Sequence, residues 1–320
     1  MARKRKGTPI HGWLAIDKPL GLTSAQVVAQ VRRVLDAAKV GHGGTLDPLA
    51  SGVLPIALGE ATKTVSYVMD GSKTYRWRVR WGQATTTDDR EGEVVETSDV
   101  RPTAEAIQAA LPAFTGEISQ VPPAFSAVKI AGARAYDLAR AGEAVEIQAR
   151  VVRIDRFALL DMPDADHADF EVVAGKGTYI RSLARDLARA LGTVGHVAVL
   201  RRTACGPFTE DNAISLETLR EVGQGPGPRT FLLPVETALD DIPALALTES
   251  EARRLQSGSP VAFARVASRH PQAEIAPDIT CRAMLGKRLV ALARIENGEI
   301  RPVRVMNLSD AQGVDDVDHR

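Results

Sequence analysis

The segment Lys73–Trp81 constrains the fold most, because hydrophobic and basic side chains alternate along most of it. Tyr75, Trp77, Val79 and Trp81 fall on one face of an extended chain, and the three arginines between them fall on the other. This spacing predicts a β-strand with one buried face and a basic outer face. The chain must therefore form a sheet that other elements cover on one side.

Further strands and helices are expected before and after this segment. Short hydrophobic runs predict strands at residues 12–17, 53–58, 94–95, 151–160, 169–174 and 196–200. Helical spacing predicts helices after Thr23 and at residues 60–68, 102–111 and 179–191. The helices are too few and too uneven for a doubly wound parallel sheet. We therefore predict an α+β fold, with a mixed β-sheet flanked by helices.

The C-terminal part carries signals of its own. Thr248 and Glu251 have the spacing of a capping box, which predicts a short helix that stops at Gly258. Asn297-Gly298 separates two strand-like runs, a strong signal for a β-hairpin. Residues 245–308 are expected to form a small, mostly β domain, after a linker around residues 234–243.

The length of 320 residues suggests one large domain and a smaller one. We place the large domain at residues 11–240, with an excursion from its sheet at about 120–150 that is rich in basic and small residues. Residues 1–10 are interpreted either as a flexible, solvated basic tail or as an electrostatic arm for a polyanion. Residues 309–320 form an acidic tail that we expect to be disordered.

Composition excludes several classes of protein. No hydrophobic run reaches membrane-spanning length, and the basic N-terminus lacks the apolar region of a secretory signal. The two cysteines, Cys205 and Cys281, form no Cys-x-x-Cys pair, so neither a disulfide framework nor a zinc site is expected. A reducing, cytoplasmic setting fits this usage. The formal net charge is zero, so any surface for nucleic acid must come from local clustering of charge.

The segment from Gly41 to Pro48 is the strongest candidate for chemistry. Its glycines allow close approach of the backbone, and His42 and Asp47 lie near its two ends. It lacks the Gly-Lys-Ser/Thr of a phosphate-binding loop, and Ser51 lacks the frame of a nucleophile elbow. The chain contains no His-Glu-x-x-His metal motif. From the residues alone, a tight turn in which Asp47 caps the next segment remains an alternative.

Six motifs together resemble the bacterial tRNA pseudouridine-55 synthases, the TruB family. They are Ile16–Ser24, Gly41–Pro55, Lys73–Tyr75, Thr85–Gly92, Gly177–Leu183 and Val199–Thr203, in the family's order and spacing. The similarity covers about residues 10–240. The following strands resemble a small RNA-binding domain similar to PUA domains. The resemblance implies the pseudouridine synthase fold and the conversion of one uridine in the TΨC loop of tRNA.

The same resemblance implies roles for individual residues. Asp47 matches the catalytic aspartate, Arg181 the arginine that pairs with it, and Tyr75 the tyrosine that stacks on the target base. His42 matches the histidine that enters the RNA stack where the base has left. Tyr179 and Leu200 match residues that line the uracil pocket.

This chemistry requires no redox cofactor, metal or energy donor, because all atoms of the uridine are kept. The carboxylate of Asp47 can attack C1′, attack C6, or remove the 2′ proton, and the sequence leaves all three routes open. A guanidinium next to it stabilises the ionised form. The uridine must leave the RNA stack, which costs a few kcal/mol. Arg201, Arg202, the excursion and the C-terminal domain are candidates for the RNA contacts that offset this cost.

We expect a monomer that acts on the tRNA T-arm stem-loop without a guide RNA. Two alternatives stay open at this point. The chain could be a tRNA-binding folding helper that needs no chemistry, or a relative of the guide-RNA-dependent pseudouridine synthases. For Tyr75 in isolation, a core aromatic is the simpler interpretation, and each basic cluster can be an ordinary solvated surface.

Overall fold

The computed structural model describes residues 7–126, 129–130, 133–134, 147–223, 230–269 and 279–308. The predicted acidic tail, the first six residues of the basic tail and most of the excursion at 120–150 lie outside the described residues.

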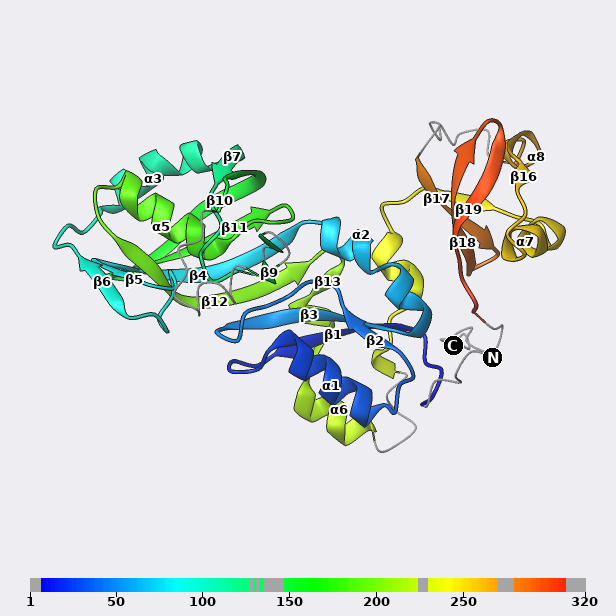
Figure 1. Cartoon of the computed structure of the whole chain (residues 1–320), viewed down its shortest axis with the longest axis horizontal. Coiled ribbons are helices and arrows are strands. Elements are labelled where there is room, and N and C mark those ends of the chain that lie inside the picture. The colour runs from blue at the N-terminus through cyan, green and yellow to red at the C-terminus, as the bar shows by residue number, and fades with distance from the viewer. Residues whose placement is uncertain are drawn as a thin grey trace, which may run out of the picture.

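Within this described part, ten strands form one mixed sheet (Figure 1). Eight of them follow each other across the sheet: β14 (Ala213–Ser215), β1 (Gly12–Lys18), β3 (Ala50–Leu58), β12 (Gly195–Cys205), β4 (Lys73–Trp81), β11 (His167–Ala174), β10 (Arg150–Asp164) and β7 (Gly116–Gln120). The short strands β2 (Val40–His42) and β13 (Phe208–Thr209) pair with β3 and β12. β1 pairs with β14, and β3 with β12, in parallel, and the other pairs are antiparallel. The predicted mixed sheet is confirmed.

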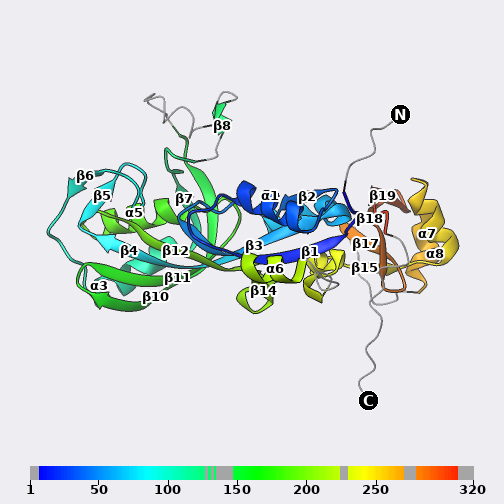
Figure 2. The ribbon, with the colours of Figure 1, turned by 90° about the horizontal axis from the view of Figure 1, so that it is seen from below.

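Helices pack at both ends of this sheet. α1 (Ser24–Val34) and α6 (Leu216–Gly223) lie side by side at one end, and α3 (Ala104–Ala110) and α5 (Ile180–Ala190) lie at the other (Figures 1 and 2). All four contribute buried side chains to one hydrophobic core. The smaller elements are η1 (Gly59–Lys63), α2 (Val65–Asp70), β5 (Gln83–Thr85), β6 (Val94–Thr97), η2 (Leu111–Phe114), β8 (Lys129–Ile130), β9 (Ala133–Arg134), η3 (Glu210–Asn212) and η5 (Val235–Leu239).

The alternating segment forms β4, as predicted. Trp77 and Trp81 are buried, and Trp77 stacks on Phe170 with ring centroids 4.8 Å apart. The basic outer face is present, but two of its arginines are paired with carboxylates. Arg78 donates to both carboxylate oxygens of Asp169 on β11, and Arg76 on the same face pairs with Glu171. Charges on the neighbouring strand therefore neutralise part of the arginine row.

Several helices differ from the expectation. The capping box of Thr23 and Gln26 is present at the start of α1. The helix expected at residues 60–68 is instead split into η1 and α2. Thr64 explains the split, because both its amide and its hydroxyl donate to the carbonyl of Ala61, three residues earlier. Likewise, the helix expected at residues 102–111 ends at Ala110 and passes into the 3₁₀ turn η2.

The C-terminal residues form a separate five-stranded sheet within the described part of the chain. Its elements are β15 (Ala244–Ala246), α7 (Glu249–Gln256), β16 (Val261–Ala262), α8 (Phe263–Ala267), β17 (Thr280–Leu285), β18 (Arg288–Glu296) and β19 (Glu299–Val305). The capping box of Thr248 and Glu251 is confirmed. Asn297 and Gly298 both have positive φ, which is the geometry of a two-residue hairpin turn. The expected small β domain and its hairpin are confirmed.

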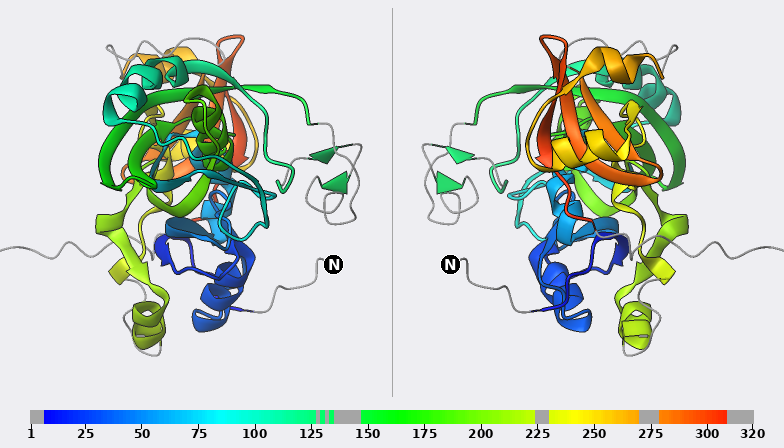
Figure 3. Two further views of the ribbon diagram at one scale, coloured as in Figure 1. Left: turned by 90° about the vertical axis from the view of Figure 1, so that its left-hand side faces the viewer. Right: turned by 90° about the vertical axis from the view of Figure 1, so that its right-hand side faces the viewer.

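The two sheets share a buried hydrophobic cluster. Trp13 and Phe208 of the large domain belong to it together with Leu289, Leu292 and Met306 of the C-terminal domain. Lys63 also donates to the carbonyl of Val305 at 2.7 Å. These contacts join the C-terminal elements, which lie in front of the large domain in Figure 3 (right), to the large domain. In the described residues, no helix is long and apolar enough to cross a membrane.

Candidate active site

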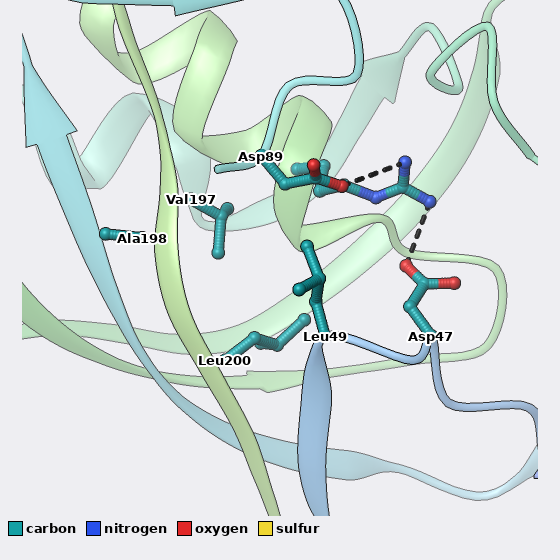
Figure 4. Close-up of a pocket in the computed structure, with 7 residues that line it drawn as sticks. Asp47, Leu49, Asp89, Val197, Ala198 and Leu200 are labelled. Carbon is teal, nitrogen blue, oxygen red and sulfur yellow. Dashed lines mark ion pairs between the residues drawn. The ribbon is translucent and has the colours of Figure 1, made fainter. Parts of the chain in front are cut away.

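Asp47 lies in the connection from β2 to β3, at the edge of a small pocket (Figure 4). The pocket is lined by Asp47, Leu49, Asp89, Arg181, Val197, Ala198 and Leu200. The amide of Ala50 donates to the carbonyl of Asp47 at 3.0 Å, which closes a tight turn into strand β3. The tight turn of the alternative interpretation is therefore present, but Asp47 does not cap a helix, because strand β3 follows it.

Arg181, near the start of α5, pairs with the Asp47 carboxylate. Its Nη2 lies 2.9 Å from Oδ2 of Asp47, and its Nη1 lies 3.6 Å from Oδ2 of Asp89. Dashed lines mark both ion pairs in Figure 4. The guanidinium also donates to the carbonyls of Thr87 and Phe125. Its side chain is 8% exposed, whereas that of Asp47 is 44% exposed. The cation is thus fixed in the protein, and the carboxylate faces the space where a substrate can enter.

Asp89 is a site residue to which the sequence assigned no role, although it lies within the Thr85–Gly92 motif. Its carboxylate accepts hydrogen bonds from the hydroxyl of Thr87 at 2.5 Å and from the amide of Glu91 at 3.1 Å. Its side chain is 11% exposed. Arg181 therefore lies between a fixed, buried carboxylate and an exposed one.

Two side chains of the first motif hold the residues on either side of Asp47. The hydroxyl of Ser24 accepts from the amide of Leu46 and donates to its carbonyl. The ammonium of Lys18 donates to the carbonyls of Leu22, Pro19 and, at 3.5 Å, Pro48.

Lys18 is fully buried, and this burial lowers its pKa to about 8. The charge of Asp47 acts against that shift, and the charge of Arg202 adds to it. The ammonium is therefore close enough to Asp47 to act on its carboxylate through charge.

Three further residues were expected to bind the target base: Tyr75, Tyr179 and Leu200. Tyr75 on β4 packs against the main hydrophobic core, and Tyr179 precedes α5 and is held by two hydrogen bonds between its backbone and Gln120. Burial raises the pKa of both tyrosines, and the charge of Asp47 raises it further. Leu200 lines the pocket, whereas neither tyrosine is part of its lining.

His42 closes β2 and is half-buried. Its Nδ1 accepts a hydrogen bond from the amide of Gly44 at 3.4 Å. Burial and the charge of Arg202 both lower the pKa of His42 below its usual value of 6.5. The imidazole is therefore neutral at neutral pH.

Arg201 and Arg202 were both candidates for RNA contacts, and for Arg202 this hypothesis is wrong. Arg202 is 1% exposed and donates to backbone carbonyls, so it cannot reach a phosphate on the surface. Arg201 on the other face of β12 is partly exposed, but it pairs with Asp17 and Glu210. Alternation along the strand separates the two, and the sequence does not say which one faces inward.

Within the described residues, no group of three or more His, Cys, Asp or Glu side chains is arranged to hold a metal ion. Cys205 and Cys281 are buried and free of disulfides.

Comparison with known proteins identifies the family of this chain. Residues 32–180 match the TruB family pseudouridylate synthase N-terminal domain, and residues 181–240 match the tRNA pseudouridylate synthase B C-terminal domain. The chain belongs to the TruB family. It is 61% identical over 308 residues to tRNA pseudouridine synthase B of Rhodospirillum rubrum, covering 96% of this chain and all of the relative. The protein of the same name from Caulobacter vibrioides is 54% identical, over 97% of this chain and 100% of the relative.

Solved structures extend the likeness to the fold. The chain resembles one in the crystal structure of a Cbf5-Nop10-Gar1 complex, with a TM-score of 0.71 and 29% identity over 92% of this chain and 84% of that one. It also resembles a chain of an H/ACA RNP bound to a substrate RNA containing 2′-deoxyuridine. There the TM-score is 0.72 and the identity 25%, over 97% of this chain and 92% of that one. The predicted pseudouridine synthase fold of this TruB family member is confirmed.

Proposed function

We propose that this chain converts uridine-55 in the TΨC loop of tRNA to pseudouridine. The observation that carries the proposal is the partly exposed carboxylate of Asp47 paired with the buried guanidinium of Arg181, in a chain of the TruB family. The relatives at 61% and 54% identity are named for tRNA, which supports tRNA as the substrate.

In the proposed reaction, the bond between C1′ and N1 of the uridine breaks, the uracil turns, and a bond forms between C1′ and C5. The proton on C5 is lost and N1 gains one, so no atom is added or removed overall. Asp47 acts as the carboxylate in one of the three routes: attack on C1′, attack on C6, or removal of the 2′ proton. Arg181 pairs with that carboxylate and fixes its direction, since a guanidinium offers paired donors in one plane.

The target base must leave the RNA stack to reach Asp47. We propose that Tyr75 stacks on the flipped uracil, while Tyr179 and Leu200 line the space that it enters. His42 then occupies the gap left in the RNA. Its neutral imidazole suits this role, because an uncharged ring loses little on entering a stack of bases.

The chain is proposed to act as a monomer, in the cytoplasm and without a guide RNA. The chain is 61% identical to a relative whose name, tRNA pseudouridine synthase B, specifies tRNA. This identity far exceeds its 25–29% identity to the chains of the Cbf5 and H/ACA RNP structures. This difference favours direct recognition of tRNA over dependence on a guide. No specific contact in the described residues favours a helper role without chemistry.

The test uses two synthetic RNAs and the purified protein alone. A T-arm stem-loop with uridine at position 55 is incubated with protein, and pseudouridine is mapped by carbodiimide labelling and primer extension. An anticodon stem-loop of equal length that contains uridine is the matched control. We expect pseudouridine in the T-arm RNA alone. Modification of both RNAs, or a strict need for an added guide RNA, would contradict the proposed substrate.

A further inference from the structure

Arg202 is a fully buried cation at the centre of the large sheet. It lies on β12 between β3 and β4, with Gly52 as its register partner on one side and Tyr75 on the other. The backbones approach closely here. A Cβ atom at Gly52, which has φ +100°, would lie 2.2 Å from the carbonyl oxygen of Arg202.

The guanidinium of Arg202 donates to three backbone carbonyls. Nε donates to Val53 at 2.8 Å, Nη2 to Gly44 at 3.1 Å and Nη1 to Thr45 at 3.4 Å. In the described part of the chain, no carboxylate lies within ion-pair distance of it. A buried charge without an ion-pair partner is costly, so a residue placed here for packing alone would be expected to be neutral.

The three carbonyls frame the loop that carries Asp47. Gly44 and Thr45 lie just before the aspartate, and Val53 lies on the strand that follows it. Ser24 holds Leu46, and Lys18 reaches Pro48 on the far side of Asp47. Arg202 therefore binds the carbonyls of Gly44 and Thr45, which those two residues do not reach.

Arg202 also acts on Tyr75. Its charge and a side-chain hydrogen bond lower the pKa of the tyrosine, against the larger effect of burial, which raises it. The guanidinium of Arg202 thus donates to the loop of Asp47, and its residue is the register partner of Tyr75 on the neighbouring strand.

We infer that Arg202 is a positioning residue for the proposed reaction: it fixes the carboxylate of Asp47 relative to the ring of Tyr75. This inference rests on the proposed function. The role requires a planar group with several donors, because a single ammonium cannot satisfy three separated carbonyls in the same way. Loss of the guanidinium leaves buried carbonyls unsatisfied and releases the loop next to Asp47.

The test compares Arg202→Met and Arg202→Lys with wild type and with Arg76→Met. Arg76 is the matched control, since it neighbours Tyr75 but points to the outer face, with its side chain 61% exposed. Three quantities are measured: the single-turnover rate on a T-arm stem-loop, the Kd for that RNA, and the thermal unfolding midpoint. A misplacement near 1 Å can cost about 100-fold in rate. We therefore expect folded Arg202→Met to react about 100-fold more slowly, with Kd within about threefold of wild type.

Arg202→Lys should fall between Arg202→Met and wild type, and Arg76→Met should match wild type in rate and Kd. A purely structural role for Arg202 would not separate rate from affinity. The inference is overturned if folded Arg202→Met keeps the wild-type rate, or if rate and affinity fall by the same factor. It is also overturned if neither Arg202 variant folds, because the residue then serves the fold as a whole. A wild-type protein that forms no pseudouridine contradicts the proposed function itself, and the inference falls with it.

Discussion

At the scale of single residues, the site consists of three neighbouring charged side chains that differ in exposure. Asp89 is buried and held, Arg181 is buried between two carboxylates, and Asp47 is partly exposed. The motifs led to Asp47 and Arg181, because those residue types in that context carry the family's chemistry. They did not assign a role to Asp89, or separate Arg202 from Arg201. A motif identifies the residue types, whereas the fold determines which of these residues become buried.

His42 provides a test of stacking against acid–base chemistry. Stacking of a base on an aromatic ring is worth roughly 1–3 kcal/mol. We expect His42→Ala to lose roughly 5- to 150-fold in kcat/KM, and His42→Phe to recover part of that loss, since stacking needs a ring and no proton. Single-turnover rates of both variants on one stem-loop decide the matter. Equal, near-total loss in both would favour a proton-transfer role.

Lys18 provides a pH dependence with a defined sign. The folded protein releases the Lys18 proton near pH 8, and the unfolded chain keeps it up to about pH 10.5. Between these values the unfolded state binds more protons, so the free energy of unfolding contributed by Lys18 rises with pH. Between pH 7 and pH 10.5, the free energy of unfolding of the wild type should rise by roughly 1–3 kcal/mol relative to that of Lys18→Met.

Urea unfolding of both proteins across this pH range measures the difference. Lys176→Met is the control, because its side chain is 69% exposed and pairs with Asp70 at the surface. A wild-type advantage that stays constant with pH, or that shrinks as pH rises, would rule out a depressed pKa for Lys18.

At the scale of elements, strands were predicted better than short helices. Alternation identified β4 over its full length, and the Asn297-Gly298 turn identified the C-terminal hairpin. By contrast, α6 has eight residues with charges among them, and the sequence did not predict it. Its buried residues Leu216 and Leu219 belong to the core next to α1, so tertiary packing stabilises it more than local propensity does.

A substitution of Gly52 tests the account at this scale, because this glycine allows β3 to lie very close to β12. Gly52 combines φ +100° with a contact that would place a Cβ 2.2 Å from the Arg202 carbonyl oxygen. Gly206 has a positive φ of +55° but open space around its Cβ position. We expect Gly206→Ala to lower the free energy of unfolding by about 1 kcal/mol, and Gly52→Ala by at least about 3 kcal/mol. If urea unfolding gives the same loss of unfolding free energy for both variants, then β3 and β12 can move apart to accept the new methyl group without cost.

At the scale of the whole molecule, the two domains are expected to act as one unit. The shared cluster of Trp13, Phe208, Leu289, Leu292 and Met306 joins the C-terminal sheet to the large domain. Two domains were predictable, because the linker and the hairpin are local signals. Their packing was not, because the contacts join residues such as Trp13 and Leu292 that are distant in sequence.

The central claim is that the carboxylate of Asp47 carries out the isomerisation. The most direct test compares wild type with Asp47→Asn in a single-turnover assay on the T-arm stem-loop, with the Kd measured in parallel. The amide keeps the shape of the side chain and removes its charge. We predict pseudouridine at position 55 with wild type, none detectable with Asp47→Asn, and a Kd within about threefold for the two proteins. Measurable turnover by Asp47→Asn free of wild-type protein would contradict the claim.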